Sequence, residues 1–329
     1  MNNEIYTHTT EVARGMGAEN NPLQLTFREG RGVDWPQQLE ALVPKAVVRS
    51  GSLEEDQWYQ WVASPNTFPV VATRNEQIVA SATLRELGPA EWWIEGIIVG
   101  PGVPNHATAQ ALLSHLLGVF REQGGGIVRT AAQQGDSVID NALRALGMRH
   151  RGSFAPHFGE AVHGDLGAFR QLGPQHQELA FKHLRTSPMY RTNRFAEHYG
   201  TLYALTEERL GEWLARPEEY PVLGWRQDNQ LRGMGVIALQ PPVLKRRIES
   251  RLYLSYLSAS DDTTLSGMLS ALRALAVVRG LTGAYWQMPL GVGLEDIASR
   301  AGFAPVVSDE ELWVYELPLR GLLAETTPL

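Results

Sequence analysis

The feature that most constrains the fold of this chain is an internal repeat: one order of strand-like and helix-like segments occurs twice within 329 residues. Leu113 and Leu269, in the middle of two matching apolar stripes, are 156 positions apart. Gly147 and Gly302, which end two later helices, are 155 positions apart. A repeat of this size indicates one structural unit used twice. The chain is therefore expected to form two domains of one architecture, each large enough to bury its own core.

Each copy begins with a predicted β-hairpin and continues into a central strand. Two strand-like runs flank a polar turn in each half, and the turn residues Arg74 and Arg226 are 152 positions apart. The central strands that follow are rich in β-branched, aromatic and leucine residues, which favour strands. The predicted strands are residues 68–73, 78–84 and 92–99 in the first copy and 220–225, 231–239 and 251–257 in the second.

A helix follows each central strand, because the apolar residues there recur at the spacing of an amphipathic helix. Gly124 and Gly280 come where the two stripes end, as helix-stopping glycines do. A short strand and a second helix complete each copy, the strands at 127–132 and 283–288. The stripes consist of Ala109, Leu112, Leu113, Leu116, Leu117 and Phe120 in the first copy and Leu265, Met268, Leu269, Leu272, Leu275 and Ala276 in the second.

These elements predict an α/β (α+β) protein with two tandem domains, each a mixed, mainly antiparallel central sheet flanked by helices. We expect the first domain at residues 23–165 and the second at 166–318. A polar N-terminal tail is expected at residues 1–22 and a C-terminal tail at 319–329. The segment 50–66 is expected to be a loop that helps to shape an acceptor pocket.

Composition excludes several classes of function. The chain has no cysteine, which excludes disulfides, thiolate metal sites and a cysteine nucleophile. Its net charge of -7 argues against binding to nucleic acid by phosphate neutralisation, and the basic residues within 182–194 are expected to form a solvated face. No signal peptide is evident, and no apolar run approaches the roughly 18 residues of a membrane span. We expect a soluble, cytoplasmic monomer or homodimer with no metal, no membrane partner and no nucleic-acid partner.

Two motifs follow one another after the first central strand. Residues 97–101 read Ile-Ile-Val-Gly-Pro, and residues 104–109 read Pro-Asn-His-Ala-Thr-Ala at the start of the helix. Their register resembles that of the GNAT N-acetyltransferase superfamily, whose central strand commonly ends in aliphatic-x-Val-x-Pro before a helix that starts Arg/Gln-x-x-Gly-x-Gly/Ala. Pro104 and Ala107 depart from the family's usual residues, and Leu143 stands where the family usually has the tyrosine that acts as its acid. With both copies counted, the resemblance covers nearly the whole chain.

The resemblance implies that the donor is acetyl-coenzyme A and that the acetyl group moves to a small-molecule primary amine. The donor would lie in the gap between the central strand and the strand at 127–132, beside Ile97, Ile98 and Val99. A backbone amide of the central strand, that of Ile98 or Val99, would polarise the thioester carbonyl where the family has a bulge.

The start of the first helix is the predicted site for the donor's diphosphate. Unpaired backbone amides at a helix N-terminus attract anions, and the donors here would be the first-turn amides, with small side chains nearby. The alternative is an ordinary helix start that Asn105 caps itself. In the second copy Asp261 or Asp262 is expected to cap the helix and repel a polyanion, so that only the first copy binds the donor. The predicted donor-binding residues of this segment are Asn105, His106, Ala107, Thr108 and Ala109.

The predicted general base is a carboxylate of the central strand. By simple alternation Glu95 and Glu91 share a face with Trp93 and Ile97, and Glu95 is nearer the expected thioester. A carboxylate there could deprotonate the acceptor ammonium directly or through water. The alternative is a solvated strand acid or an ion-pair partner for Arg85.

The sequence therefore predicts direct acetyl transfer in a ternary complex, catalysed by the first domain while the second has lost its donor site. The rival hypothesis is a non-catalytic, degenerate acetyltransferase that senses acyl-coenzyme A or serves as a binding scaffold. The missing tyrosine and the altered loop favour the rival.

Overall fold

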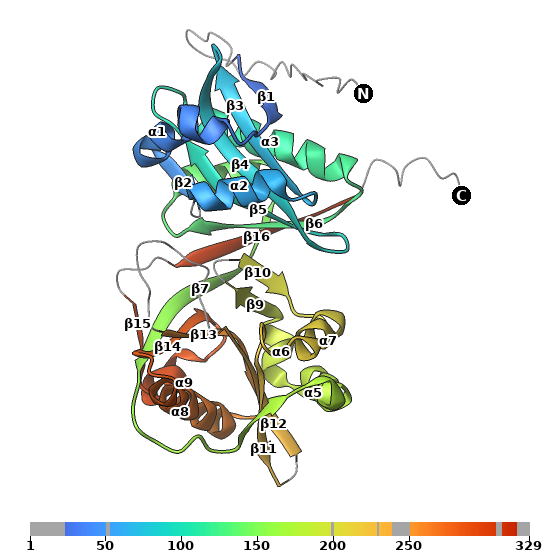
Figure 1. The fold of residues 1–329 in the computed structure, drawn as a ribbon, viewed down its shortest axis with the longest axis vertical. Helices are drawn as coiled ribbons and strands as arrows, with labels where there is room; N and C mark the ends of the chain where they lie inside the picture. The colour runs from blue at the N-terminus through green and yellow to red at the C-terminus, as the bar shows by residue number, and fades with distance from the viewer. Residues whose placement is uncertain are drawn as a thin grey trace, which may run out of the picture. The chain divides into compact units, whose positions relative to one another are not determined.

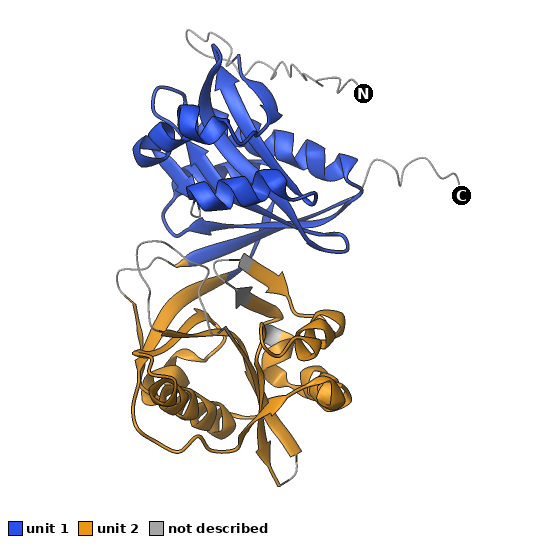
Figure 2. Cartoon of the chain, viewed as in Figure 1, with its two compact units in different colours: residues 1–152, 312–329 blue, residues 153–311 orange. Residues whose placement is uncertain are grey.

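The computed structural model describes residues 24–50, 53–198, 201–228, 230–238, 251–306 and 311–320. The chain forms two compact units, residues 1–152 with 312–329 and residues 153–311 (Figure 2). The predicted tail at 1–22 and residues 321–329 of the other lie outside the described residues.

The first unit is a sheet with helices on both faces (Figure 1). Its sheet has the order β1-β3-β4-β5-β6-β16, and β2 pairs with β5 in addition. Only the β5–β6 pair is parallel, and the other pairs are antiparallel. The elements are β1 (Thr26–Glu29), η1 (Trp35–Leu39), α1 (Glu40–Leu42), η2 (Val43–Lys45), β2 (Val48–Ser50), α2 (Glu55–Ala63), β3 (Thr67–Arg74), β4 (Gln77–Gly88), β5 (Glu91–Val99), α3 (Asn105–Glu122), β6 (Gly125–Gln133), α4 (Ser137–Ala145) and β16 (Leu312–Arg320).

The second unit repeats this arrangement, with β13 and β14 as its parallel pair. The strand β7 (Arg149–Glu160) begins in the first unit and continues in the second, where it pairs with β14 and β15. The remaining elements are β8 (Phe169–Leu172), η3 (Pro174–His176), α5 (Gln177–Thr186), α6 (Pro188–Thr192), β9 (Phe195–His198), β10 (Thr201–Ala204), α7 (Glu207–Ala215), β11 (Val222–Gln227), β12 (Gln230–Ala238), β13 (Arg251–Ala259), α8 (Asp262–Val278), β14 (Gly283–Pro289), α9 (Glu295–Arg300) and β15 (Phe303–Pro305).

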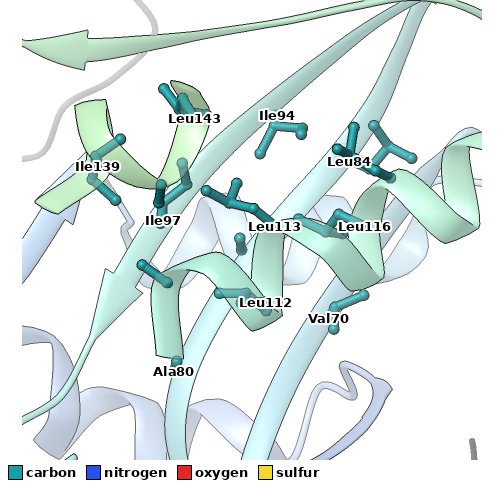
Figure 3. Packing of buried hydrophobic residues seen from close by; sticks show 14 of the residues in the cluster. Val70, Ala80, Leu84, Ile94, Ile97, Leu112, Leu113, Leu116, Ile139 and Leu143 are labelled. Atoms are coloured by element: carbon teal, nitrogen blue, oxygen red, sulfur yellow. The ribbon is translucent and has the colours of Figure 1, made fainter. Parts of the chain in front are cut away.

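The predicted fold class is confirmed, and so are the hairpins, the central strands, and the long helix and shorter second helix of each copy. In the first hairpin both turn residues, Asn75 and Glu76, have positive φ, as a type I′ turn requires. The apolar stripe of α3 is buried along its whole length. It packs on the sheet together with α4, as Figure 3 shows for Leu113, Leu116, Ile139 and residues of the strands beneath them. The opposite face of this sheet is covered by η1 and by the tryptophans of α2.

The boundaries of the units differ from the predicted domains. The last strand, β16, pairs along its whole length with β6 of the first unit, from Leu312 opposite Gln133 to Arg320 opposite Gly125. The corresponding place beside β14 in the second unit is taken by β7. Each sheet thus receives its final strand from the sequence of the other copy. Because strand pairing is not local in sequence, the predicted ranges 23–165 and 166–318 follow the repeat but not the compact units, and the predicted tail from 319 begins inside β16.

Candidate functional site

The start of α3 presents backbone amides that nothing in the helix uses. The N-cap is Pro104, which makes no side-chain cap, and the first turn contains no acidic residue. Asn105 is the first helical residue, so the predicted alternative of a self-capping Asn105 does not occur. The amide of Thr108 donates to the carbonyl of Pro104 at 2.9 Å. The first-turn amides of Asn105, His106 and Ala107 therefore remain for an anion, since the first N–H groups of a helix have no partner within it.

Two of the predicted donor-binding amides are committed to the helix. Thr108 is fully buried and its amide is the one that bonds to Pro104, while Ala109 lies one position deeper, where the N–H donates to the carbonyl four residues before it. The predicted anion site is thus shorter by two residues, because only the amides of the first turn of an α-helix lack a partner within the helix.

The start of α8 is closed by an aspartate, as predicted. Asp261 is the N-cap, and its Oδ1 accepts from the amide of Thr264 at 2.8 Å. The hydroxyl of Ser260 donates to Oδ2 at 2.7 Å, and these two hydrogen bonds, that of Ser260 first, lower the pKa of Asp261. Asp262 adds a second acid in the first turn. An anion would meet two carboxylates here.

A gap opens between β5 and β6 where the donor was expected. The two strands pair only as far as Ile94 opposite Thr130, although β5 runs on to Val99. One extra residue then bulges from β5, since Ala82 of β4 stands opposite both Gly96 and Ile97. Gly96 has φ +62°, the left-handed conformation that favours glycine at such a bulge. The predicted bulge of the central strand is therefore present.

The gap contains the chain's own strand β2. Val48, Arg49 and Ser50 pair antiparallel with Val99, Ile98 and Ile97. The hydroxyl of Ser50 donates across to the carbonyl of Ala131 on β6 at 2.5 Å, so that β2 touches both walls of the gap. Val48 and Ser50 are buried.

The backbone directions at the end of β5 decide between the two predicted polarising amides. The amide of Gly100 donates to the carbonyl of Val79 on β4 at 2.8 Å. In a strand, the N–H and C=O groups of one residue point to one edge, and those of the next residue point to the opposite edge. The N–H and C=O of Val99 therefore point away from β4, and the carbonyl accepts from Val47 at 2.9 Å. The amide of Ile98 points toward β4. Of the two candidates only Val99 faces the gap, and there it faces β2.

The second unit has the same gap with a different cover. β13 pairs with β14 only as far as Leu254 opposite Trp286, and Ser255 is the extra, bulged residue. Ala259 occupies the place of Val99, and its amide donates to the sulfur of Met189 at 3.3 Å. The hydroxyl of Ser187 donates to the carbonyl of Ala259, also at 3.3 Å. Side chains from the start of α6 therefore lie at this edge, where the first unit has a paired strand.

Glu95 forms the ion pair that the sequence left as the alternative to catalysis. Its carboxylate accepts from Nε of Arg85 at 2.7 Å and from Nη2 at 3.3 Å, and its side chain is 14% exposed. The expectation that Ile97 shares a face with Glu95 is wrong, because the bulge at Gly96 shifts the alternation by one residue. Ile97 packs instead in the core beneath α3 and α4 (Figure 3).

Glu91 belongs to a buried ionic cluster and not to the neighbourhood of the bulge. Nη1 of Arg129 donates to Glu91 at 2.5 Å, and Nε of the same arginine donates to Glu316 of β16 at 2.8 Å. Arg151 also bonds to Glu316. Burial by itself raises the pKa of Glu316, but the hydrogen bonds from Arg129 and Arg151 outweigh it and leave that pKa lowered. This cluster ties β5, β6 and β16 together, which is a structural role.

A tyrosine that the sequence did not single out reaches α4 from β16. Leu143, at the family's tyrosine position, is fully buried in the core (Figure 3). The hydroxyl of Tyr315 donates to Asp140 on α4, and burial followed by this bond raises the pKa of Tyr315 to about 12. Sequence spacing gave no signal for it, because Tyr315 comes from a strand 175 residues away from Asp140.

Within the described ranges, no three acidic or histidine side chains come together in a way that could hold a metal ion. None of the helices described combines the length and the apolar character needed to cross a bilayer.

Comparison with known proteins supports this architecture. The model of the Acetyltransferase (GNAT) family matches residues 35–147, which lie in the first unit. No curated protein matches the chain.

Several solved structures share the fold of both copies. A GCN5-related N-acetyltransferase from Sphaerobacter thermophilus has a TM-score of 0.61 at 10% identity over 92% of this chain and 98% of its own. A tandem GNAT protein from the clavulanic acid biosynthesis pathway has a TM-score of 0.54 at 11% identity over 89% of this chain and 98% of its own. The glucosamine N-acetyltransferase region of a fungal multi-domain β-N-acetylglucosaminidase has a TM-score of 0.63 at 13% identity over 90% of this chain, and the match spans 38% of that protein. At these identities the likeness concerns the fold.

Proposed function

Because the chain is a tandem protein of the GNAT acetyltransferase fold, we propose that its first unit catalyses acetyl-coenzyme A-dependent N-acetylation of a small-molecule primary amine in the cytoplasm. The observation that carries the proposal is the uncapped, acid-free start of α3 directly after the bulged central strand. The second unit lacks this feature, since Asp261 caps its helix. We assign donor binding to the first unit and a supporting role to the second.

The donor would supply an activated acetyl group, and the residues of the first unit would position it. The amides of Asn105, His106 and Ala107 would bind the diphosphate, favoured by the positive end of the helix dipole. The amide of Val99 is the group at the gap that could polarise a carbonyl. Its use requires that β2 give up its place beside it.

Glu95 is the proposed base. It adjoins the bulge, whereas Glu91 is held by Arg129. Its carboxylate already binds one cation, the guanidinium of Arg85, and a carboxylate can attract an ammonium group and accept its proton. The phenol of Tyr315 stays protonated at neutral pH because its pKa is about 12, so it is available as a proton donor if the leaving thiolate reaches it.

The proposal predicts that Glu95→Gln lowers turnover by about 100-fold or more, the usual contribution of a general base, with acetyl-coenzyme A affinity unchanged. Steady-state kinetics on a panel of amines and calorimetric titration with acetyl-coenzyme A measure the two quantities. The control is Glu86→Gln: Glu86 is a partly buried carboxylate on β4, and its position in the alternation places it on the opposite face of the sheet. Equal turnover of Glu95→Gln and wild type would remove Glu95 from the site.

A non-catalytic acyl-coenzyme A sensor or scaffold is the second candidate. It is favoured by the strand in the gap, by the ion pair of Glu95 and by the leucine at position 143. Saturable binding of acetyl-coenzyme A without turnover on any amine would decide for it.

A further inference from the structure

Beyond Ile94, β5 has an edge with which β6 no longer pairs, and an extended ligand can add to a strand edge of this kind. On the β4 side its groups are already paired, and on the other side β6 has diverged. A ligand arm that carries amide groups binds such an edge as an added strand does, through its backbone-like hydrogen bonds. The acyl-bearing arm of coenzyme A has this chemistry.

The structure fills that edge with β2, and we infer that β2 is an internal competitor of the donor's acyl-bearing arm, so that donor binding requires β2 to leave β5. The inference rests on the proposed function and concerns the regulation of the same site. It predicts different access for the two ends of the donor. The start of α3, where the diphosphate would bind, is accessible, whereas the edge at Ile97 and Val99, where the acyl-bearing arm would bind, is covered.

The contacts of β2 show why it can both hold the gap and leave it. It has only three residues and pairs with one strand. It is fixed at its ends by the bond from Val47 to Val99 and by the bond from Ser50 to Ala131, and between them Arg49 is exposed. Val48 is anchored in the apolar cluster beneath α3 and α4. Because β2 pairs with β5 alone, its departure would break no pairing between the other strands.

The energetic consequence is a reduced affinity for the intact donor. When only a fraction of the molecules has the open gap, the apparent dissociation constant rises by the inverse of that fraction. A ligand that contacts only the start of α3 does not depend on the gap and escapes this reduction. The two kinds of ligand therefore distinguish competition by β2 from a general weakness of the site.

A reversible covalent lock tests the inference directly. Val48 and Val99 stand opposite each other in the antiparallel pair, a spacing at which two cysteines can form a disulfide, and the chain has no other cysteine. Val48→Cys with Val99→Cys is prepared in the full chain, and mass spectrometry monitors the disulfide. We titrate the oxidised and the reduced forms with acetyl-coenzyme A and with adenosine 3′-phosphate 5′-diphosphate, which lacks the arm.

The expected result is that oxidation weakens acetyl-coenzyme A binding by at least about tenfold and that reduction restores it, while the nucleotide binds both forms equally. The reduced double variant is the matched control, because it has the same residues without the bond. Equal affinity of the oxidised and reduced forms for acetyl-coenzyme A would overturn the inference and leave the proposed function standing. If neither ligand binds any form, wild type included, the proposed function fails and the inference fails with it.

A second variant keeps the inference testable if the cysteine pair does not fold. Ser50→Ala removes the bond to Ala131 and should raise acetyl-coenzyme A affinity about fivefold, the effect of one typical hydrogen bond, without changing nucleotide affinity. Hydrogen exchange should become faster at residues 48–50. Faster exchange with unchanged acetyl-coenzyme A affinity would contradict competition by β2.

Discussion

The two units place the same helix after the same bulged strand but leave its first turn in opposite electrostatic states. In α3 the N-cap is a proline and three amides remain for a ligand, whereas in α8 Asp261 takes up one of the amides and Asp262 adds negative charge. The backbone is alike in both, so the difference lies in a few loop residues. A duplicated fold can therefore change the function of one copy without changing its architecture.

The two gaps differ in a second way. The amide of Val99 lies behind a strand, and the equivalent amide of Ala259 lies against the sulfur of Met189. A backbone strand satisfies the edge as a peptide-like ligand would, while a thioether is a weak acceptor. The first unit thus covers its edge with something that resembles the ligand, and the second covers it with side chains.

The largest expected effect comes from the ionic cluster around Arg129 in the first unit. Arg129→Met leaves Glu91 and Glu316 without their shared partner, and the side chains concerned are 13% and 10% exposed. Removing one member of a buried ionic group costs about 3–5 kcal/mol, and the bond from the more exposed Arg151 is what Glu316 then keeps. Denaturant unfolding, followed by the fluorescence of a tryptophan in each unit, should show the loss in the first unit.

Arg185→Met is the control for that prediction. In the Arg185–Glu207 pair the side chains are 65% and 37% exposed, so water can replace the lost partner of Glu207. Its effect on stability should be much smaller than that of Arg129→Met. Equal losses for the two variants would show that the Arg129 cluster has no special role in holding β16.

The next effect concerns ligand binding at the two helix starts. His106→Glu places a carboxylate beside the free amides of α3 and should weaken acetyl-coenzyme A binding roughly tenfold. The reason is repulsion between this carboxylate and the charges of the diphosphate, which amounts to about 1 kcal/mol for each charge pair at close approach in water. The same change should slightly stabilise the helix, since an acid in the first turn is favourable to the dipole. Titration calorimetry measures the expected loss of affinity, and thermal unfolding of the same sample measures the expected gain in stability.

Thr263→Glu makes the corresponding change in α8, where Thr263 is the exposed second residue of the helix as His106 is in α3. Acetyl-coenzyme A affinity should not change. A loss of affinity in Thr263→Glu, with none in His106→Glu, would reverse the assignment of donor binding to the first unit.

Much of this architecture could be predicted because it depends on residues that are close together in the sequence. The amphipathic stripe of α3, the hairpin turn at Asn75 and the cap at Asp261 each depend on residues within a few positions of one another. For the same reason the repeat revealed both copies. The open start of α3 followed from the absence of a capping side chain, which is also local.

The remaining features depend on pairing between distant segments. The bulge at Gly96 reversed the face of Ile97, and a glycine in a strand gives only a weak signal for such a shift. The position of β2 was missed because Val47 and Val48 are too short a run to predict a strand, and α2 was likewise missed within the predicted loop 50–66. β16 belongs to the first unit through contacts between residues far apart in the sequence. Glu316 of β16, for example, bonds to Arg129, which lies 187 residues earlier.

The smallest effect we predict tests the closed helix start of the second unit. Asp261→Ala removes the side chain that accepts from Thr264 and should cost about 1 kcal/mol, the usual value of an N-cap. Because the folded pKa of Asp261 lies below its ordinary value of 3.8, its contribution is complete above that value and is lost as the pH falls through the folded pKa. Denaturant unfolding of both proteins should show the difference at neutral pH.

Asp261→Asn separates the cap from the charge in that experiment. Asparagine caps about as well as aspartate, so most of the stability should remain, and its effect should not change with pH as that of aspartate does. A difference between Asp261→Ala and wild type that persists unchanged into acid would show that the carboxylate does not act through the bond to Thr264. In that case the contrast between α3 and α8 would rest on Asp262 and on the loop backbone. The absence of a capping side chain would then not explain why the first-turn amides of α3 remain free to bind an anion.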